Sequence, residues 1–266
     1  MGTARDVPAG PGAWHARGRM LHAGAFKTVR TARDLTEKTA RDVPEHPSQR
    51  RWSIGMTSTL PDISLSTDRL VLRPFEEADV PALAEMMSDE LVTAWTALPH
   101  PYTLADARAW ATGKAAAVRT AGRGIALAVT EFLTQRLVGA IVLDHTDWRL
   151  RSAEIRYVTA PWARGEGYAS ESVLAVAQWL FRDLGFERIE LRTAADNTAA
   201  QQVAQKIGCI SEGVLRNAWI ARSRTEDGGW TDIRTDLIVW SLLPEDLDGL
   251  PGRMADANGF AYPEWN

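Results

Sequence analysis

Cysteine, histidine and long apolar runs are scarce in this sequence, and each shortage excludes a class of protein. The single cysteine, Cys209, excludes an intrachain disulfide and a cysteine-rich zinc site, and it is typical of a reducing compartment. The five histidines show no spacing typical of metal ligands, so we expect no metal. No apolar run approaches the roughly 18 residues of a membrane span, and the N-terminus has no apolar signal-peptide core. We therefore expect a cytoplasmic protein without membrane contact.

A large excess of positive charge is also missing. The chain has a net charge of -4, which argues against nucleic acid as a partner. Residues 1–55 differ from the rest, because they hold ten Lys and Arg against five Asp and Glu and repeat the sequence ARDVP. This stretch has too few large apolar residues to offset the entropy of ordering, so we interpret it as a disordered basic tail. The alternatives are an arm that binds RNA or a ribosome, and a natural start at Met56.

The remaining residues have the patterns of a globular domain, which we place at 56–245, followed by an irregular tail at 246–266. Apolar periodicity predicts these elements in order: a strand within 63–75, a helix capped by Asp79, a helix from Thr103 to Arg119, three strands between 125 and 160, a helix over 169–184, a strand at 187–194, a helix over 198–207, and a closing antiparallel pair joined by a polar loop at 222–230. Three consecutive strands precede the first crossover. The pattern therefore favours a mixed sheet in an α+β (α/β) fold.

The segment EIRYVTAPWARGEGYAS, residues 154–170, combines a strand, a glycine-rich turn and a helix start. Gly165 and Gly167 let the backbone approach an anion, and the helix N-terminus adds partial positive charge. A pyrophosphate suits this geometry, in either a dinucleotide or coenzyme A, although a tight turn alone also uses such glycines. The dinucleotide fingerprint needs a third glycine or alanine where this chain has Ser170, and it belongs near the start of a domain. Coenzyme A is therefore the better match.

At these residues the chain resembles a known family. The stretch from EIRYVTAPWARGEGYAS through LRTAADNTAAQQVAQKIGCISEGVLRN is similar to the core of the GNAT superfamily of N-acetyltransferases, and most of all to its RimJ/RimL-like ribosomal-protein N-terminal acetyltransferase branch. The opening DRLVLRPFEEADVPAL and the ending DIRTDLIVWSLLPEDL resemble the same branch. The resemblance spans about 63–243, and it implies a GNAT fold with flanking helices and a splayed parallel strand pair.

The resemblance also implies acetyl-CoA as co-substrate, in the gap between the strands at 154–160 and 187–193. The pantetheine arm would then pair with the backbone of Tyr157, Val158 and Thr159. The pyrophosphate would be held by amides of six consecutive residues: Arg164, Gly165, Glu166, Gly167, Tyr168 and Ala169. Asn197 would touch the cofactor arm, and it is equally suited to be the N-cap of the following helix.

Three positions depart from the family pattern. Trp162 stands where the family has Gln or Arg, which matters little if this position contributes only a backbone amide. Ala200 replaces a serine whose hydroxyl is proposed in some relatives to protonate the leaving thiolate. Cys209 replaces a phenylalanine, and we interpret it as a small buried hydrophobic residue.

The implied reaction is direct attack of an amine on acetyl-CoA in a ternary complex. Glu154, on the strand before the turn, is the candidate general base, and an ion pair with a strand arginine is its alternative role. Trp95, His100 and Trp110 are candidates to shape the acceptor site, although core packing is the simpler role for both tryptophans. The acceptor is a protein N-terminus or a small-molecule amine. A non-catalytic acyl-CoA sensor or scaffold stays open as the alternative function, as does a homodimer.

Overall fold

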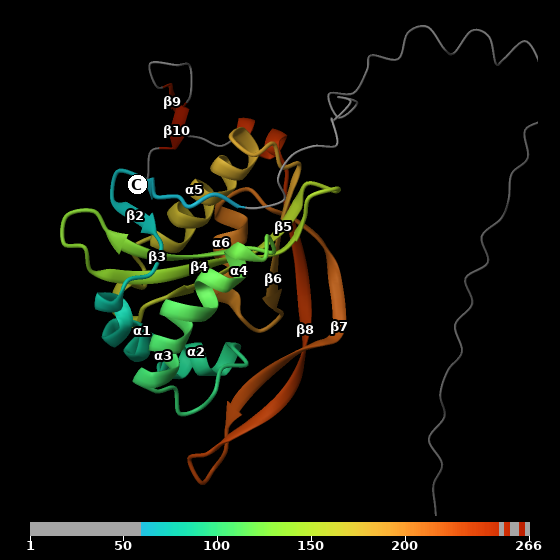
Figure 1. Ribbon diagram of the computed structural model, residues 1–266. Coiled ribbons are helices and arrows are strands. Elements are labelled where there is room, and N and C mark those ends of the chain that lie inside the picture. Colours follow the sequence, from blue (N-terminus) through green and yellow to red (C-terminus); the bar gives the residue numbers. More distant parts are fainter. Residues whose placement is uncertain (1–59, 250–252, 256–260, 264–266) are drawn as a thin grey trace, which may run out of the picture. The chain divides into compact units, whose positions relative to one another are not determined.

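The computed structural model describes residues 60–249, 253–255 and 261–263 (Figure 1). The predictions for residues 1–55 and for Met56 lie outside these residues. The strands of the main sheet are β1 (Leu65–Ser66), β2 (Leu70–Arg73), β3 (Ile125–Glu131), β4 (Leu137–Asp147), β5 (Ser152–Thr159), β6 (Arg188–Ala194), β7 (Ile210–Arg224) and β8 (Trp230–Leu242). The α-helices are α1 (Val80–Met87), α2 (Glu90–Trp95), α3 (Leu104–Ala109), α4 (Ala115–Thr120), α5 (Tyr168–Arg182) and α6 (Thr198–Lys206).

The eight strands form one mixed sheet in the order β1-β2-β3-β4-β5-β6-β8-β7. In the described part of the chain, β5 and β6 are the single parallel pair of this sheet, and its other neighbours are antiparallel. Helix α5 makes the crossover that a parallel pair requires. The mixed sheet predicted from the strand order is therefore confirmed.

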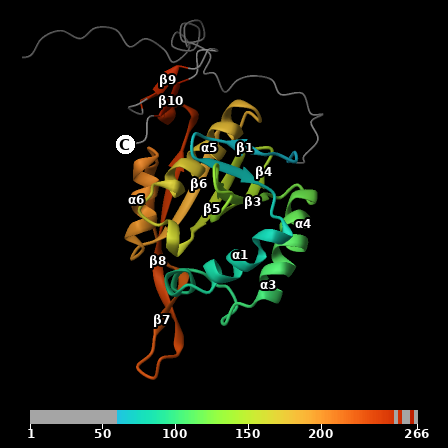
Figure 2. The ribbon, with the colours of Figure 1, turned by 90° about the vertical axis from the view of Figure 1, so that its left-hand side faces the viewer.

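Helices cover both faces of the sheet. Figure 2 shows α5 and α6 on one face and α1, α3 and α4 on the other. The predicted apolar stripe of α5 is the reason it packs: Val173, Ala177 and Leu180 each have no exposed surface. Burying one such large aliphatic side chain stabilises the fold by about 1.5–3 kcal/mol. The helix ends at Arg182, slightly before the predicted end, and Leu184 packs as a partly buried neighbour of the core.

The start of α3 has the predicted capping interaction, whereas the start of α1 does not. The Thr103 hydroxyl accepts from the Asp106 amide at 3.2 Å, and the Asp106 carboxylate accepts from the Thr103 amide at 2.9 Å. This reciprocal pair confirms the predicted capping box. Asp79, in contrast, does not cap α1 with its side chain. Its carboxylate accepts from the Glu76 amide and pairs with Arg73, because a 3-10 turn at Glu77–Asp79 begins the helical segment earlier.

Several elements differ from the sequence predictions. Helix α2 was not predicted, and the predicted helix over 103–119 is three pieces with a π-helical turn at Trp110–Lys114 in the middle. The loop predicted at 222–230 is shorter, because β7 continues to Arg224 and β8 begins at Trp230. In the tail predicted to be irregular, Pro244–Gly249 is a 3-10 helix, and β9 (Arg253–Ala255) pairs with β10 (Ala261–Pro263).

Candidate functional site

The parallel strands β5 and β6 separate part-way along their length. Their register covers only Ser152–Glu154 of β5 and Arg188–Glu190 of β6. Beyond that point β5 continues its pairing with β4 as far as Thr159, and β6 continues its pairing with β8 as far as Ala194. The edge of β5 that faces the gap is therefore unpaired with β6 from Ile155 onward. A splayed pair was expected at these strands, and the register shows where it opens.

The turn from β5 to α5 leads from this gap into a helix N-terminus. Gly165 and Gly167 have φ angles of 84° and 78°, in the left-handed region that favours glycine. Gly167 is the N-cap of α5, and no side chain caps the helix there. The first amides of α5 are consequently left to other acceptors, as in helix N-termini that bind phosphate.

Residues from both sides of the turn line one small pocket. Its walls are Val129, Val138, Gly139, Tyr157, Val158, Thr159, Tyr168, Ala169 and Ser172. Five of the predicted cofactor-binding residues, at 157–159 and 168–169, are therefore brought together. Gly139 permits the close approach of β4 to β5, because a Cβ there would lie 2.7 Å from the Val158 carbonyl oxygen.

Tyr157 and Asn197 both fix helix α6 beside the gap. The Tyr157 hydroxyl donates to the Ala200 carbonyl at 3.2 Å, and burial, with a smaller contribution from Cys209, raises the pKa of this phenol well above its ordinary value. The Asn197 side chain accepts from the Ala200 amide at 3.1 Å, so the N-cap role considered for it is present. Ala200 itself is thus held through its backbone by both residues.

An ion pair between the half-exposed Arg69 and the buried Glu171, which the sequence did not indicate, holds the glycine turn in place. Glu171 is only 2% exposed, and its carboxylate accepts from Arg69 Nε at 2.8 Å and from the Thr67 hydroxyl at 2.5 Å. Arg69 also donates to the Glu166 carbonyl at 3.1 Å, and its guanidinium lies 4.9 Å from the centre of the Tyr168 ring. The opening strand therefore holds the turn in place. The two residues of this ion pair lie about 100 positions apart, so no local pattern joins them.

The Arg164 side chain has a definite partner. Its guanidinium pairs with Asp89, which also accepts from the Leu91 and Val92 amides at the start of α2. Burial raises the pKa of the Asp89 carboxyl, but the hydrogen bonds from Arg164 and the two amides outweigh it, so the pKa lies below its usual value. The Arg164 side chain is consequently anchored to α2.

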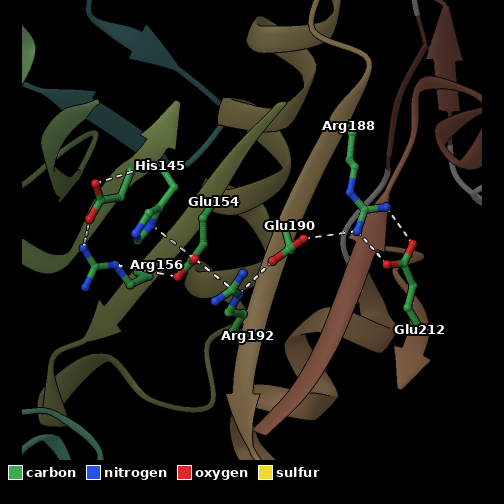
Figure 3. A network of polar contacts seen from close by, with 8 residues as sticks. His145, Glu154, Arg156, Arg188, Glu190, Arg192 and Glu212 are labelled. Carbon is green, nitrogen blue, oxygen red and sulfur yellow. Dashed lines mark hydrogen bonds and ion pairs between the residues drawn. The ribbon is translucent and has the colours of Figure 1, made fainter. Parts of the chain in front are cut away.

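Glu154 lies where the two strands separate, within a network of alternating charges (Figure 3). It is 7% exposed, and its Oε2 atom lies 3.4 Å from Arg192 Nε and 3.4 Å from His145 Nδ1. Arg192 in turn contacts Glu190 at 2.7 Å, and Arg156 Nε is 4.0 Å from Glu154 Oε1. The ion pair considered as an alternative role for Glu154 is therefore present. These side chains lie on the face opposite α5 and α6, since alternation along β5 turns Tyr157 toward α6.

Comparisons with known proteins agree with this geometry. A family profile described as "Acetyltransferase (GNAT) domain" matches residues 69–210. The chain belongs to the GNAT family of acetyltransferases. An uncharacterised N-acetyltransferase of Bacillus subtilis, YoaA, is 32% identical over 152 residues, which cover 57% of this chain and 85% of YoaA.

Two solved structures show the same fold for this GNAT protein. Mycobacterium smegmatis RimJ in complex with CoA-disulfide has a TM-score of 0.57 at 22% identity, covering 67% of this chain and 83% of RimJ. RimL, a ribosomal L7/L12 α-N-protein acetyltransferase in complex with coenzyme A, has a TM-score of 0.59 at 19% identity, covering 70% and 100%. The predicted resemblance to the RimJ/RimL-like branch is thus confirmed by these structural neighbours. Acetyl-CoA is the co-substrate of the GNAT family.

The three acceptor-site candidates of this acetyltransferase have different surroundings. The His100 ring packs edge-on against Trp230, with centroids 5.8 Å apart, so it lies beside the β7–β8 hairpin. Trp110 packs edge-on against Phe75 at 4.9 Å and contacts the core, as the simpler role predicted. Trp95 is the half-buried last residue of α2. His100 and Trp110 therefore pack against different partners.

Cys209 has the packing role expected from the sequence. It is 8% exposed, and burial, followed by the nearby Asp246, raises the pKa of its thiol to about 12. A thiol in this state is a poor nucleophile. Among the residues that the structure describes, no helix is long and apolar enough to cross a membrane, and no three His, Cys, Asp or Glu side chains are grouped to hold a metal.

Proposed function

We propose that this acetyltransferase moves the acetyl group of acetyl-CoA to a primary amine, by direct attack while both substrates are bound. The observation that carries the proposal is the separation of β5 and β6 at Glu154 and Glu190, beside the pocket at Tyr157–Thr159. An extended arm with amide groups suits the unpaired edge of β5, because that edge offers backbone donors and acceptors in the register of a missing strand.

The glycine turn fits the phosphates of acetyl-CoA. A Cβ built on Gly167 would lie 3.4 Å from Lys206 Nζ and 3.7 Å from Arg69 Nη2, so two cations flank the space that the glycine leaves. The α5 N-terminus adds amides with partial positive charge. We expect the amides of Arg164, Gly165, Glu166, Gly167, Tyr168 and Ala169 to hold the pyrophosphate, and Asn197 to lie near the pantetheine arm.

Glu154 is the residue we propose as general base. It sits at the bottom of the gap on the face opposite α5 and α6, so an acceptor that enters from that face meets it next to the thioester. Arg192 Nε lies 3.4 Å from the carboxylate and orients it. Removal of one proton converts an ammonium into the neutral amine that attacks the thioester carbonyl. An amide of β5 that points into the gap, such as that of Tyr157 or Thr159, is suited to polarise that carbonyl, because the neighbouring amides of Val158 and Ala160 point toward β4.

The acceptor we propose is a protein N-terminus or a small amine. The similar fold of RimL, a ribosomal L7/L12 α-N-protein acetyltransferase, supports the first class. The acceptor side is formed by α2 with the segment after it, and by the distal part of the β7–β8 hairpin. Arg222 Nη1 donates to the Leu98 carbonyl at 2.7 Å, which joins these two walls.

The test is a measurement of thiol release from acetyl-CoA with two amine probes, spermidine and a short peptide with an N-terminal serine, together with calorimetry of acetyl-CoA binding. Amine-dependent thiol release with acetylated product by mass spectrometry is the expected result. Tight acetyl-CoA binding without turnover on either probe would instead favour the acyl-CoA sensor, for which the missing hydroxyl at Ala200 is the supporting feature. Absence of binding would contradict both.

A further inference from the structure

Strand β4 is irregular near its end, beside the separation of β5 and β6. Asp144 pairs with Glu154, but the next paired residue of β4 is Asp147, opposite Ser152. Between them His145 has a φ angle of 48°, in the left-handed region that residues other than glycine rarely adopt. A left-handed residue of this kind costs roughly 1–2 kcal/mol. Such bulges re-aim side chains and are common next to active sites.

The bulge turns the His145 side chain toward Glu154. Along a regular strand, the residue after Asp144 would point to the opposite face of the sheet from Asp144 and its partner Glu154. Instead, His145 Nδ1 lies 3.4 Å from Glu154 Oε2, as Figure 3 shows. The His145 side chain is 71% exposed, whereas that of Glu154 is 9% exposed. His145 therefore connects the buried carboxylate to solvent.

The other charged groups that face this pair are two arginines and an aspartate paired with one of them. Arg192 contacts Glu154 from β6, and Arg156 contacts both Glu154 and Asp144. Guanidinium groups stay protonated at any pH at which the protein is folded. Asp144 accepts from the backbone amide of His145 at 2.9 Å and is paired with Arg156. Among the described residues in contact with Glu154, the imidazole of His145 is thus the group that can accept a proton on one ring nitrogen and release one from the other.

We propose that His145 is a proton relay. It acts through Glu154, because it accepts the proton from that carboxyl and so returns it to the ionised form after each turnover. The inference rests on the proposed function, in which Glu154 is the base. An acceptor ammonium has three N–H protons, and the product amide keeps one. As the C–N bond forms and the C–S bond breaks, one proton goes to the sulfur of coenzyme A. The remaining proton goes to Glu154, then to His145 Nδ1, and the imidazolium releases a proton to water.

Two variants test the relay. Asparagine tolerates the left-handed backbone and can donate a hydrogen bond, but its amide does not take up and release protons, so H145N preserves the bulge without the relay. Glycine tolerates the same backbone and leaves the most space, so H145G admits imidazole from solution to the exposed position. Steady-state rates are measured with acetyl-CoA and with spermidine or the N-terminal serine peptide, whichever the unchanged protein acetylates, with and without imidazole.

The expected result is a kcat lowered by at least about 10-fold in both variants, with acetyl-CoA affinity and melting temperature close to those of the unchanged protein. Imidazole should restore several-fold turnover to H145G and have no effect on H145N or on Glu154→Gln. A kcat of H145N equal to that of the unchanged protein would overturn the relay, and so would a loss in H145G that imidazole does not reverse. Absence of any turnover by the unchanged protein would be the separate failure of the proposed function.

Discussion

Glu154 and Arg192 lie 3.4 Å apart across the point where β5 and β6 separate. The contact joins the two strands at the last rung of their parallel ladder, on the face away from α5 and α6. It makes Glu154 both a structural and a chemical candidate, because the same carboxylate contacts an arginine of the neighbouring strand and lies where the gap begins. The two roles predict different consequences for the same substitution.

Substitution of Glu154 by Gln should separate these roles. The change keeps the shape and removes the base, so turnover should fall by about 10²-fold while acetyl-CoA affinity stays nearly unchanged. The deficit should shrink at high pH, where more of the acceptor amine is already neutral. Kinetics across pH and calorimetry measure both effects.

Glu190→Gln is the matched control for this substitution. Glu190 shares Arg192 with Glu154 at 2.7 Å and is its partner in the parallel register, but it is on β6 and contacts Arg188 as well. If E190Q lowers turnover as much as E154Q does, the charge network matters as a whole, and Glu154 is not the base.

A second prediction concerns the role of Gly167 in acetyl-CoA binding, and the backbone conformation there limits which substitution can test it. A branched residue at Gly167 is strained whatever its effect on ligand, because the φ angle there is 78°. Asparagine tolerates this conformation best after glycine, at a cost of roughly 1–2 kcal/mol. Gly167→Asn should lower acetyl-CoA affinity by about 10-fold or more, which corresponds to about 1.4 kcal/mol. Calorimetry measures the affinity.

Gly228→Asn controls for the backbone cost. Gly228 has a φ angle of 81° in the turn of the β7–β8 hairpin, and a Cβ there would contact nothing within 4 Å. Both variants should lose similar melting temperature, and only G167N should lose affinity. Equal affinities would leave Gly167 as a turn residue without a role in binding.

A third prediction concerns acid stability. The hydrogen bonds and charge of Arg188, with a hydrogen bond from Ser241, lower the pKa of Glu212 from 4.5 to about 2. A carboxyl whose folded pKa lies below its unfolded value stabilises the protein above the unfolded value and loses that effect as pH falls toward the folded value. The melting temperature should therefore fall more between about pH 4.5 and pH 2 in the unchanged protein than in Glu212→Gln. Parallel curves would show that the surface pair contributes nothing.

The fourth prediction concerns residues 1–55, which we propose are a tail outside the acetyltransferase domain. A protein that begins at Met56 should match the full chain in melting temperature and in acetyl-CoA affinity. Thermal unfolding and calorimetry of the two proteins test this. A large loss of melting temperature in the shorter protein would show that the tail is part of the folded domain.

The sequence predicted most of the elements because their signals are local. The stripe of α5, the capping box at Thr103 and the glycine turn each lie within one element. The resemblance then indicated a candidate cofactor site at 157–159 and 164–169. Helix α2 was not predicted, because its six residues are too few to show an apolar period, although Asp89 before it is a recognisable N-cap.

The features that the sequence did not predict depend on contacts between distant residues. The local sequence around Arg69 indicates only a polar residue at the edge of a strand. Its ion pair with Glu171 depends on the packing of β2 beside α5, which no local pattern predicts. His145 is an isolated histidine in a strand pattern, and only the bulge after Asp144 turns it toward Glu154. The positions of such side chains are set by the register between strands, which periodicity alone does not fix.

The short parallel ladder has a mechanical consequence. In the described residues it divides the main sheet into two antiparallel blocks, one from β1 to β5 and one from β6 to β8, joined along a seam of three residue pairs. A small rotation at this seam changes the width of the gap without breaking a hydrogen bond inside either block. The contact between Glu154 and Arg192 crosses the seam where the gap begins, so it resists such a rotation together with the three residue pairs.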